Sequence, residues 1–343
     1  MSYNESLAAR GHTGPGDLMV VQRTTSDVLE QADALPFWKQ DYTQLSKGEF
    51  AGAVNSVSRR GLQLFRETMN RSVDEVASAP ADSYVIGLPT VVEGEASWGL
   101  LPIDACSLLT LDKNSELLFR TSTRSEIAAV VIPAECLERY AEQVEGTDLR
   151  KTLESVKPAE CMCPEISARL KAVLVEGLKR FGEDPLDEDE HEQAWRHFED
   201  ELLASCMQAL TRGRADGAKH QEHRIHRYIV NRVRDATLAS PGYPPTISDL
   251  CLQLRVSRRT LNHAFIRVLG ITPVAYMRNI RLHRVRAQLQ GAPEQIGTIA
   301  SVAGKWGFWH MSLFSRYYRE LFGELPMGTL NRARSMRTEG WRQ

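Results

Sequence analysis

The stretch Ser257-Arg-Arg-Thr-Leu-Asn-His-Ala-Phe-Ile-Arg-Val-Leu-Gly270 decides the fold, because a second version, His310-Met-Ser-Leu-Phe-Ser-Arg-Tyr-Tyr-Arg-Glu-Leu-Phe-Gly323, follows 53 residues later. In each version apolar residues recur every four positions, which is the pattern of a helix with one buried stripe. Each version ends in Gly, with Pro three residues further on, and this combination ends a helix. The equivalent pairs are Leu261 and Phe314, Phe265 and Tyr318, Leu269 and Phe322, Gly270 and Gly323, and Pro273 and Pro326.

A short helical segment precedes each of these helices. Ile247 to Leu254 has the apolar spacing of a helix, Arg255-Val256 supplies a turn, and Ser257 is a good N-cap for the helix that follows. Ile299 to Trp306 repeats this arrangement, and Gly307 supplies a turn residue that tolerates positive φ. We therefore predict two helix-turn-helix units, at about 246–269 and 298–322.

The charge of the chain is unevenly distributed. The 343 residues have 42% hydrophobic content, enough for about two domains, and a formal net charge of −2. Residues 219–343 hold 20 Lys and Arg against 7 Asp and Glu, a net charge of +13, whereas residues 1–218 hold 22 against 37, a net charge of −15. A basic half of this kind favours a polyanionic partner such as nucleic acid. The alternative is that the two halves attract each other.

The sequence contains no pattern typical of a catalytic, metal or membrane site. We find no phosphate-binding glycine loop, no nucleophile elbow and no metal-ligand spacing of His and Cys. The N-terminal residues lack the basic flank and apolar run of a signal peptide, and no run of about 18 apolar residues predicts a membrane span. Six cysteines without a disulfide framework fit a reducing compartment. We expect a cytoplasmic protein that is neither an enzyme nor a metal binder.

The first half of the chain changes character twice. Residues 24–45 have mixed helical character, and residues 50–133 contain about seven short β-favouring runs, which argues for a β-sandwich or barrel. Helical periodicity returns at about 164–181 and 188–212. A polar, Gly-bearing stretch at 214–222 is interpreted as a linker between a domain at 1–213 and a domain at 223–343.

The two helices predicted at 164–181 and 188–212 each carry one apolar face. These faces can cover the open end of a barrel or pair with the same helices of a second chain, and symmetric dimers are the commonest oligomers. The residues that we predict for a homodimer contact are Ile166, Leu170, Leu174, Leu178, Trp195, Phe198 and Leu202.

The C-terminal pattern resembles the AraC/XylS family of bacterial transcription regulators. The segments that carry this resemblance, in the right order and spacing, are Leu250–Ser257, Leu261–Phe265, Leu269–Pro273, Arg281-Leu282, Val302–Phe308, Phe314–Tyr318 and Phe322–Pro326. The resemblance implies an α+β multidomain fold: an N-terminal cupin-like β-barrel with covering or dimerisation helices, and an all-α domain of seven helices. A long helix from Pro273 to Gln290, about 27 Å in length, would place two recognition helices in successive major grooves roughly 34 Å apart.

The resemblance also implies ligands and partners. The first domain would sense an effector and dimerise, and the second would bind double-stranded promoter or operator DNA and work with RNA polymerase. Val20 to Phe50 and Gly307-Phe-Trp-His310 further resemble the ethanolamine-operon regulators. That branch implies ethanolamine and cobalamin as ligands of the barrel and a catabolic operon as the target. The same fold also serves signalling or virulence programmes without a small-molecule effector, and activation and repression both stay open.

The two recognition helices differ in their polar residues. Arg258, Arg259 and Asn262 lie toward the N-terminal end of the first helix, where Arg suits guanine and Asn suits adenine. His263 stands where the family commonly has Arg. We therefore expect the first unit to supply most of the base readout, Arg316 to bind phosphate, and Trp309 and Met311 to pack internally. The full set of predicted DNA contacts is Ser257, Arg258, Arg259, Thr260, Asn262, His263, Arg267, His310, Ser312, Ser315 and Arg316.

Two functions of other kinds compete with this interpretation. A DNA-repair protein with a cysteine methyl acceptor would need a zinc-bound cysteine cluster in the first half, and the scattered cysteines do not provide one. A purely architectural DNA binder would bind in a strongly salt-dependent manner without sequence preference.

Overall fold

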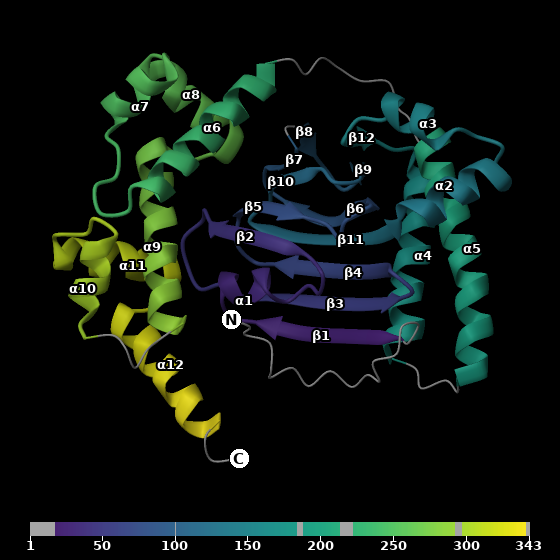
Figure 1. The fold of residues 1–343 in the computed structure, drawn as a ribbon, viewed down its shortest axis with the longest axis horizontal. Helices are drawn as coiled ribbons and strands as arrows, with labels where there is room; N and C mark the ends of the chain where they lie inside the picture. Colours follow the sequence, from purple (N-terminus) through teal and green to yellow (C-terminus); the bar gives the residue numbers. More distant parts are fainter. Residues whose placement is uncertain (1–17, 100, 184–187, 213–221, 292–296, 341–343) are drawn as a thin grey trace.

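The computed structural model describes residues 18–99, 101–183, 188–212, 222–291 and 297–340, and it has two parts (Figure 1). Strands and helices up to Arg212 form the first part, and helices from Glu222 onward form the second. Figure 1 shows the C-terminal helices at one end of the strands and the helices α4 (Pro164–Glu183) and α5 (Glu188–Arg212) at the other. The protein is thus a two-domain α+β molecule, as predicted. The predicted linker at 214–222 lies outside the described residues except for Glu222.

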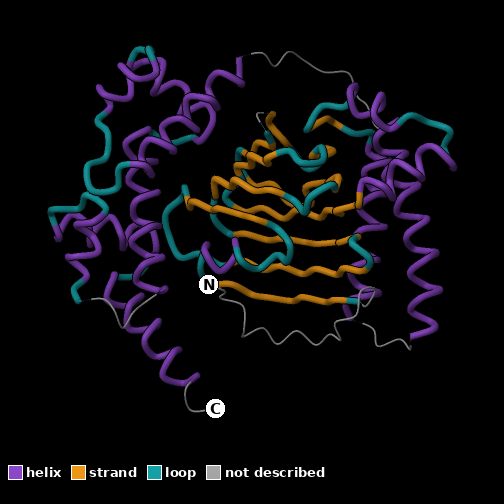
Figure 2. Tube along the Cα trace, viewed as in Figure 1, coloured by secondary structure: helices purple, strands orange, loops and turns teal. Residues whose placement is uncertain are grey.

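The strands form two antiparallel sheets, shown in orange in Figure 2. The seven-stranded sheet contains, in spatial order, β1 (Met19–Thr25), β3 (Gly52–Arg59), β4 (Leu62–Met69), β11 (Arg124–Pro133), β6 (Ser83–Glu93), β9 (Ser107–Leu111) and β12 (Ala159–Cys161). The five-stranded sheet contains β2 (Lys39–Gln44), β5 (Val73–Ser78), β10 (Glu116–Arg120), β7 (Ala96–Trp98) and β8 (Leu101–Ile103).

The two sheets pack around a shared apolar core. Val54 and Phe65 of the larger sheet belong to the same buried cluster as Trp98 and Phe119 of the smaller sheet. The rings of Trp98 and Phe119 lie 5.3 Å apart, and the Trp98 indole donates to the carbonyl oxygen of Thr110 at 2.9 Å. The edge strands of one sheet form no ladder with the edge strands of the other among the described residues. The predicted cupin-like barrel is therefore not closed, and the arrangement is a two-sheet sandwich, the alternative that the strand pattern left open.

The segment from Thr24 to Leu45 is mostly extended rather than helical. It contains the end of β1, the five-residue helix α1 (Val28–Ala32) and the strand β2. Strand β1 pairs with β3 and strand β2 pairs with β5, so hydrogen bonds from distant parts of the chain decide the local conformation. The prediction of helical character here is wrong because pairing within a sheet outweighs local propensity.

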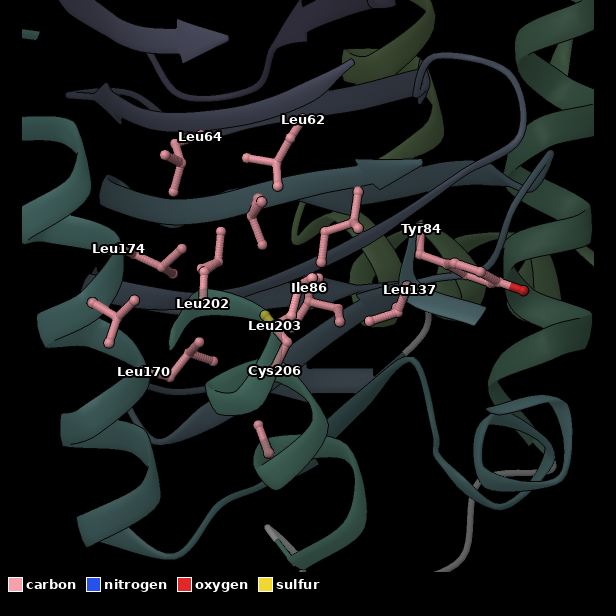
Figure 3. Packing of buried hydrophobic residues seen from close by; sticks show 14 of the residues in the cluster. Leu62, Leu64, Tyr84, Ile86, Leu137, Leu170, Leu174, Leu202, Leu203 and Cys206 are labelled. Atoms are coloured by element: carbon pink, nitrogen blue, oxygen red, sulfur yellow. The ribbon is translucent and has the colours of Figure 1, made fainter. Parts of the chain in front are cut away.

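The helices that follow the strands cover the outer face of the larger sheet. These helices are α2 (Ala134–Gln143), α3 (Leu149–Ser155), α4 and α5. Leu170 and Leu174 of α4 and Leu202 of α5 point toward Leu64 and Ile86 of the sheet (Figure 3).

This packing uses the residues that were predicted for the homodimer contact. Leu170, Leu174, Trp195, Phe198 and Leu202 are buried inside the chain. Ile166 and Leu178 are partly buried against the same cluster. The apolar faces therefore serve the covering role, because their side chains already pack within one chain. Any dimer contact of this helix pair has to use its outer face, and dimerisation stays a prediction.

The C-terminal part consists of helices around one long central helix. Their bounds are α6 (Glu222–Ala239), α7 (Ile247–Leu254), α8 (Arg258–Leu269), α9 (Pro273–Gly291), α10 (Ile299–Lys305), α11 (Met311–Phe322) and α12 (Pro326–Gly340). We call α7 and α8 the first helix pair, and α10 and α11 the second helix pair. No described helix combines the length and apolar character needed to cross a membrane.

The helix ends follow from the local sequence. Thr246 and Asp249 form a capping box at the start of α7, and Ser257 caps α8 by accepting a hydrogen bond from the Thr260 backbone. Gly270 and Gly323 end α8 and α11 in the left-handed conformation, with φ of 68° and 78°. Glycine adopts this conformation without steric cost, which explains why the repeat keeps it at both positions.

Candidate DNA-binding interface

The first helix pair presents polar side chains over a buried apolar stripe. Leu261, Ala264 and Phe265 of α8 are buried in the core, whereas Arg258 and Arg259 are exposed in its first turn. Asn262, one turn further on, is also exposed. These three polar side chains therefore extend from the N-terminal half of α8 into solvent, where they can reach a ligand.

Four other predicted residues, the N-cap Ser257 and three residues of α8, have structural partners or lie further along the helix. The Ser257 hydroxyl accepts from the Thr260 backbone at 3.1 Å and lies 2.9 Å from the Thr260 hydroxyl, so both side chains are used in the cap. The His263 ring packs edge-on against the ring of His226 of α6, with centroids 5.0 Å apart. Arg267 is exposed in the last turn, far from the first-turn arginines.

The second helix pair has a different surface. Ser312 and Arg316 are exposed, and Ser315 is half-buried. His310 occupies the N-cap of α11, but its side chain makes no capping hydrogen bond. The Arg316 guanidinium lies 3.8 Å from the Glu320 carboxylate in an exposed i,i+4 pair.

Trp309 and Met311, which were expected to pack internally, behave differently from each other. Met311 is half-buried and packs against the core of the second helix pair. Trp309 is 66% exposed, so its assignment to the core is wrong. Phe308, the residue before it, fills the core position instead and lies 5.2 Å from the ring of Phe314.

The central helix α9 joins the cores of the two helix pairs. Tyr276 and Ile280 in its first half are buried with the first pair, and Leu282, Val285 and Leu289 in its second half are buried with the second pair. Nineteen residues make a helix about 28 Å long. Because both cores contain side chains of one rigid helix, the distance between α8 and α11 is fixed by packing.

A second set of site residues, which the sequence did not identify, joins the two domains. Arg227 of α6 pairs with Asp74 of β5 at 3.0 Å, and the Tyr276 hydroxyl donates to the same carboxylate at 2.5 Å. Arg286 of α9 pairs with Asp27, and its guanidinium also lies 2.9 Å from Glu324. Each of these arginines belongs to the basic half, and Asp27 and Asp74 belong to the acidic half. Attraction between the halves, the alternative raised by the charge distribution, is thus present in the structure.

A third acidic residue of the N-terminal domain pairs with two arginines. The Asp41 carboxylate lies 2.5 Å from Arg234 of α6 and 2.9 Å from Arg284 of α9. This contact is only partly buried, unlike the pairs of Asp27 and Asp74. The only sequence signal for any of these contacts is the opposite net charge of the two halves.

The residue Gln44, at the end of β2, contacts both the central helix α9 and the helix α11 of the second helix pair. Its backbone N–H donates to Nε2 of His283 at 2.9 Å, and its carbonyl accepts from the Asn279 side chain at 3.1 Å. Its side chain donates to the carbonyl oxygen of Leu321 in α11 at 2.8 Å. The next residue, Leu45, is buried in the core of the first helix pair. One short segment of the N-terminal domain therefore touches both helix pairs.

The two C-cap glycines of the repeat are also contact points for the N-terminal domain. A Cβ on Gly270 would lie 2.4 Å from the Arg120 guanidinium, and a Cβ on Gly323 would lie 2.3 Å from Cγ of Glu49. Arg120 also donates to the carbonyl oxygen of Val268 at 3.4 Å. The N-terminal domain thus meets α8 and α11 at equivalent positions, which ties the orientation of both helices to that domain.

Burial shifts the titration of groups at this interface. Burial lowers the pKa of His283 to about 4, so the imidazole is neutral and its Nε2 accepts from Gln44. For Asp27, burial acts to raise the pKa, but the charge of Arg286 and the hydrogen bonds it receives lower the pKa below its ordinary value. The interface therefore contains a neutral histidine beside a charged ion pair.

A polar cluster lies between the sheets of the N-terminal domain. The Glu67 carboxyl accepts from the Gln31 side chain at 2.8 Å and from the Tyr42 hydroxyl at 3.1 Å. Gln40 donates to Glu75 at 3.4 Å. Burial raises the pKa of Glu67 to about 7, and burial together with the nearby Glu67 raises the pKa of Glu75 well above its ordinary value. Two carboxyl groups therefore occupy a position that apolar side chains fill elsewhere in the sandwich.

A groove of about 690 Å³ lies on the outside of the N-terminal domain, between β6, β9 and the helices α2 and α3. Tyr84 donates to the Glu138 carboxylate at 2.8 Å, and Lys113 pairs with the same carboxylate at 2.8 Å. The charges on this wall are therefore already paired within the chain.

Known proteins are similar in sequence to the second domain of this chain. The family model described as a helix-turn-helix domain matches residues 250–332. Over 76 residues the chain is 42% identical to the XylDLEGF operon transcriptional activator 2 of Pseudomonas putida, covering 22% of this chain and 48% of that protein. It is 37% identical over 79 residues to another XylDLEGF operon transcriptional activator of that organism, covering 23% and 25% of the two chains.

The AraC-like transcriptional activator CuxR is a similar solved structure, with 18% identity and a TM-score of 0.38 over 78% of this chain and 96% of that chain. The chain spans about half of the first curated relative and a quarter of the second. The family match contains the last five residues of α7 and all of α8, α9, α10 and α11. Residues 250–332 therefore match a helix-turn-helix domain, and this part of the chain is similar to operon transcriptional activators.

Proposed function

We propose that this chain is a sequence-specific DNA-binding transcription regulator that controls promoters through two helix-turn-helix units. The first helix pair supplies most of the base readout, and the second mainly positions the protein on DNA. The operon activators to which the chain is similar support a role at promoters. RNA polymerase is the second partner in this proposal.

The observation that carries the proposal is the surface of α8. Arg258, Arg259 and Asn262 extend from the N-terminal half of a helix whose opposite face is buried. Arg bonds the O6 and N7 atoms of guanine, and Asn bonds the N6 and N7 atoms of adenine, in the major groove. The equivalent residues of α11 are Met311, Ser312 and Ser315, which have a shorter polar reach or none.

The ion pairs between the domains are consistent with DNA binding by the exposed surface of α8 and α11. They neutralise arginines on the inner faces of α6 and α9, among them Arg227 and Arg286. Arg258, Arg259 and Arg316 are exposed on the recognition helices instead. The basic charge that stays available for phosphate is thereby concentrated on the helix pairs.

Regulation in this proposal works through linkage between the domains. An effector or a second chain that favours one arrangement of the N-terminal domain changes which half-sites the helix pairs can span. The sequence resemblance to ethanolamine-operon regulators suggests ethanolamine with cobalamin as the ligands. A homodimer would use the outer face of α4 and α5.

The test compares Arg259→Ala with Arg316→Ala on a cognate duplex, selected from a random library, and on scrambled DNA. We expect Arg259→Ala to lose about 1–3 kcal/mol of discrimination between the two duplexes. Arg316→Ala should weaken binding to both duplexes alike and reduce the slope of affinity against salt by about 1.

Arg332→Ala is the matched control, because Arg332 of α12 is exposed but pairs with Glu324, off the recognition helices. Equal loss of discrimination in the Arg259 and Arg316 variants would overturn the dominance of the first helix pair. Selection that yields no preferred sequence would favour a purely architectural DNA binder.

A further inference from the structure

Two large apolar side chains stand exposed at the start of the second recognition helix. Trp309 is 66% exposed and Leu313 is 37% exposed, although their neighbours Phe308 and Phe314 are buried. The core of the second helix pair is filled by Phe308, Phe314 and other residues, so neither exposed side chain is needed to complete it. Their exposure leaves apolar surface in water, so a ligand that covers it would gain free energy.

These side chains share a face with a cation. Leu313 and Arg316 are three residues apart on α11 and share one side of it, and Trp309 lies directly before the N-cap His310. The Arg316 side chain is 62% exposed. His310 and Ser312, also exposed, lie between them in the sequence. The face thus combines an apolar centre with polar and cationic groups beside it.

The repeat identifies what this face meets. With the offset of 53 residues, Trp309 corresponds to Val256 and Leu313 to Thr260. These two positions flank Arg258 and Arg259, Val256 in the turn before the N-cap and Thr260 in the first turn of α8. The same region of the second helix pair therefore addresses the same kind of ligand, the edges of base pairs in the major groove, with the larger apolar Trp309 and Leu313 where the first pair has Val256 and Thr260.

One base offers an apolar group in the major groove. Thymine carries a C5-methyl group there, whereas the other groups that base pairs expose are hydrogen-bond donors and acceptors. Apolar side chains cover this methyl group and gain the free energy of removing it from water. Cytosine in the same place would bring an amino group that Leu313 and Trp309 cannot accept a hydrogen bond from.

We propose that Trp309 and Leu313 read thymine methyl groups, so that the second helix pair selects T·A base pairs in its half-site while Arg316 binds the adjacent phosphate. This inference rests on the proposed function. It gives the second helix pair a sequence preference of its own, weaker than that of the arginines on α8 because an apolar contact lacks the directionality of a bidentate hydrogen bond.

Deoxyuracil substitution tests the proposal, because deoxyuracil pairs like thymine and lacks only the methyl group. A duplex selected from a random library is scanned by replacing each thymine in turn, and affinity is measured for the full-length protein. We expect each contacted methyl group to contribute roughly fourfold to affinity. Leu313→Ala and Trp309→Ala should each abolish the sensitivity at the thymine that the residue contacts and leave the sensitivity of other thymines unchanged.

Leu325→Ala is the control, since Leu325 is 50% exposed beyond the C-terminal end of α11. It should bind every duplex like the unaltered protein. Leu313→Thr, which copies the first recognition helix and keeps a methyl group, should retain part of the sensitivity.

The inference is overturned if no thymine outside the half-site of α8 responds to substitution, or if the Leu313 and Trp309 variants lose the same affinity for the thymine and deoxyuracil duplexes. The second outcome would place these side chains against a protein partner or in a structural role. Both results leave sequence-specific binding intact. Failure of the proposed function is recognised separately, by the absence of any selected sequence.

Discussion

Arg227 of α6 and Asp74 of β5 form an ion pair of 3.0 Å across the domain interface, with side chains only 3% and 1% exposed. Asp74 lies on β5 next to Glu75, and successive side chains of a strand point to opposite faces. Asp74 contacts the DNA-binding domain, whereas Glu75 belongs to the polar cluster between the sheets. One strand therefore connects the interior of the N-terminal domain with helices α6 and α9.

Replacing Arg227 with Met should lower the free energy of unfolding by about 3–5 kcal/mol, because Asp74 would stay buried without its cation. Unfolding in urea, followed by tryptophan fluorescence, measures the change. Arg232→Met is the control on the same helix, since the pair of Arg232 and Asp235 is exposed and 4.0 Å long, and it should cost less than about 1 kcal/mol.

The double variant Arg227→Met with Asp74→Leu separates the lost charge from other effects of the substitution. It should regain part of the stability, because removing both partners leaves no unpaired charge. A single variant as stable as the unaltered protein would show that water reaches Asp74.

Replacing Glu67 with Gln should stabilise the protein increasingly as the pH rises. The pKa of Glu67 is raised from 4.5 to about 7 by burial, so the folded state binds more protons than the unfolded state between these values. The contribution of Glu67 to stability is therefore present below pH 4.5 and is lost as the pH rises through 7. Glutamine keeps the acceptor for Gln31 and Tyr42 but does not ionise.

The difference in unfolding free energy between Glu67→Gln and the unaltered protein should grow by about 3 kcal/mol from pH 4.5 to pH 8. Urea unfolding at a series of pH values measures it. Glu142→Gln, a change at an exposed position of α2, should show no such trend. A difference that is constant with pH would mean that Glu67 ionises in the folded protein as it does in water.

His283 should produce the opposite pH dependence. Burial lowers its pKa from 6.5 to about 4, so the unfolded state binds more protons between these values and stability falls as the pH falls. Relative to His283→Gln, whose side-chain oxygen can accept from Gln44, the unaltered protein should lose about 3 kcal/mol between pH 7 and pH 4. The exposed His197→Gln should leave the pH profile unchanged. Equal profiles for His283→Gln and the unaltered protein would contradict the buried, neutral imidazole.

The features that could be predicted from the sequence are those that depend on residues close together in the chain, such as helices and their caps. The apolar spacing of Leu261 and Phe265 and the cap at Ser257 are sufficient to define α8 and its exposed face. Arg286 and Asp27 are 259 residues apart, and no local pattern relates them. The sequence does not show which of the neighbours Phe308 and Trp309 the turn at Gly307 directs into the core. The prediction for Trp309 is wrong for this reason. The conformation of Thr24–Leu45 depended on strands β3 and β5, which lie elsewhere in the chain.

Replacing either C-cap glycine, Gly270 or Gly323, with Ala should have different effects, because the added Cβ contacts different neighbours at the two positions. Gly323→Ala introduces a Cβ 2.3 Å from Cγ of Glu49, in the middle of a side chain, and Gly270→Ala introduces one 2.4 Å from the guanidinium at the far end of the Arg120 side chain. Both substitutions carry the left-handed backbone cost of about 1–2 kcal/mol. Gly323→Ala should therefore destabilise the protein more than Gly270→Ala, and adding Glu49→Ala should reduce its cost to that of the backbone alone. Urea unfolding of the unaltered protein, the three single variants and the double variant measures this. Additive effects of Glu49→Ala and Gly323→Ala would show that the N-terminal domain does not press on the end of α11.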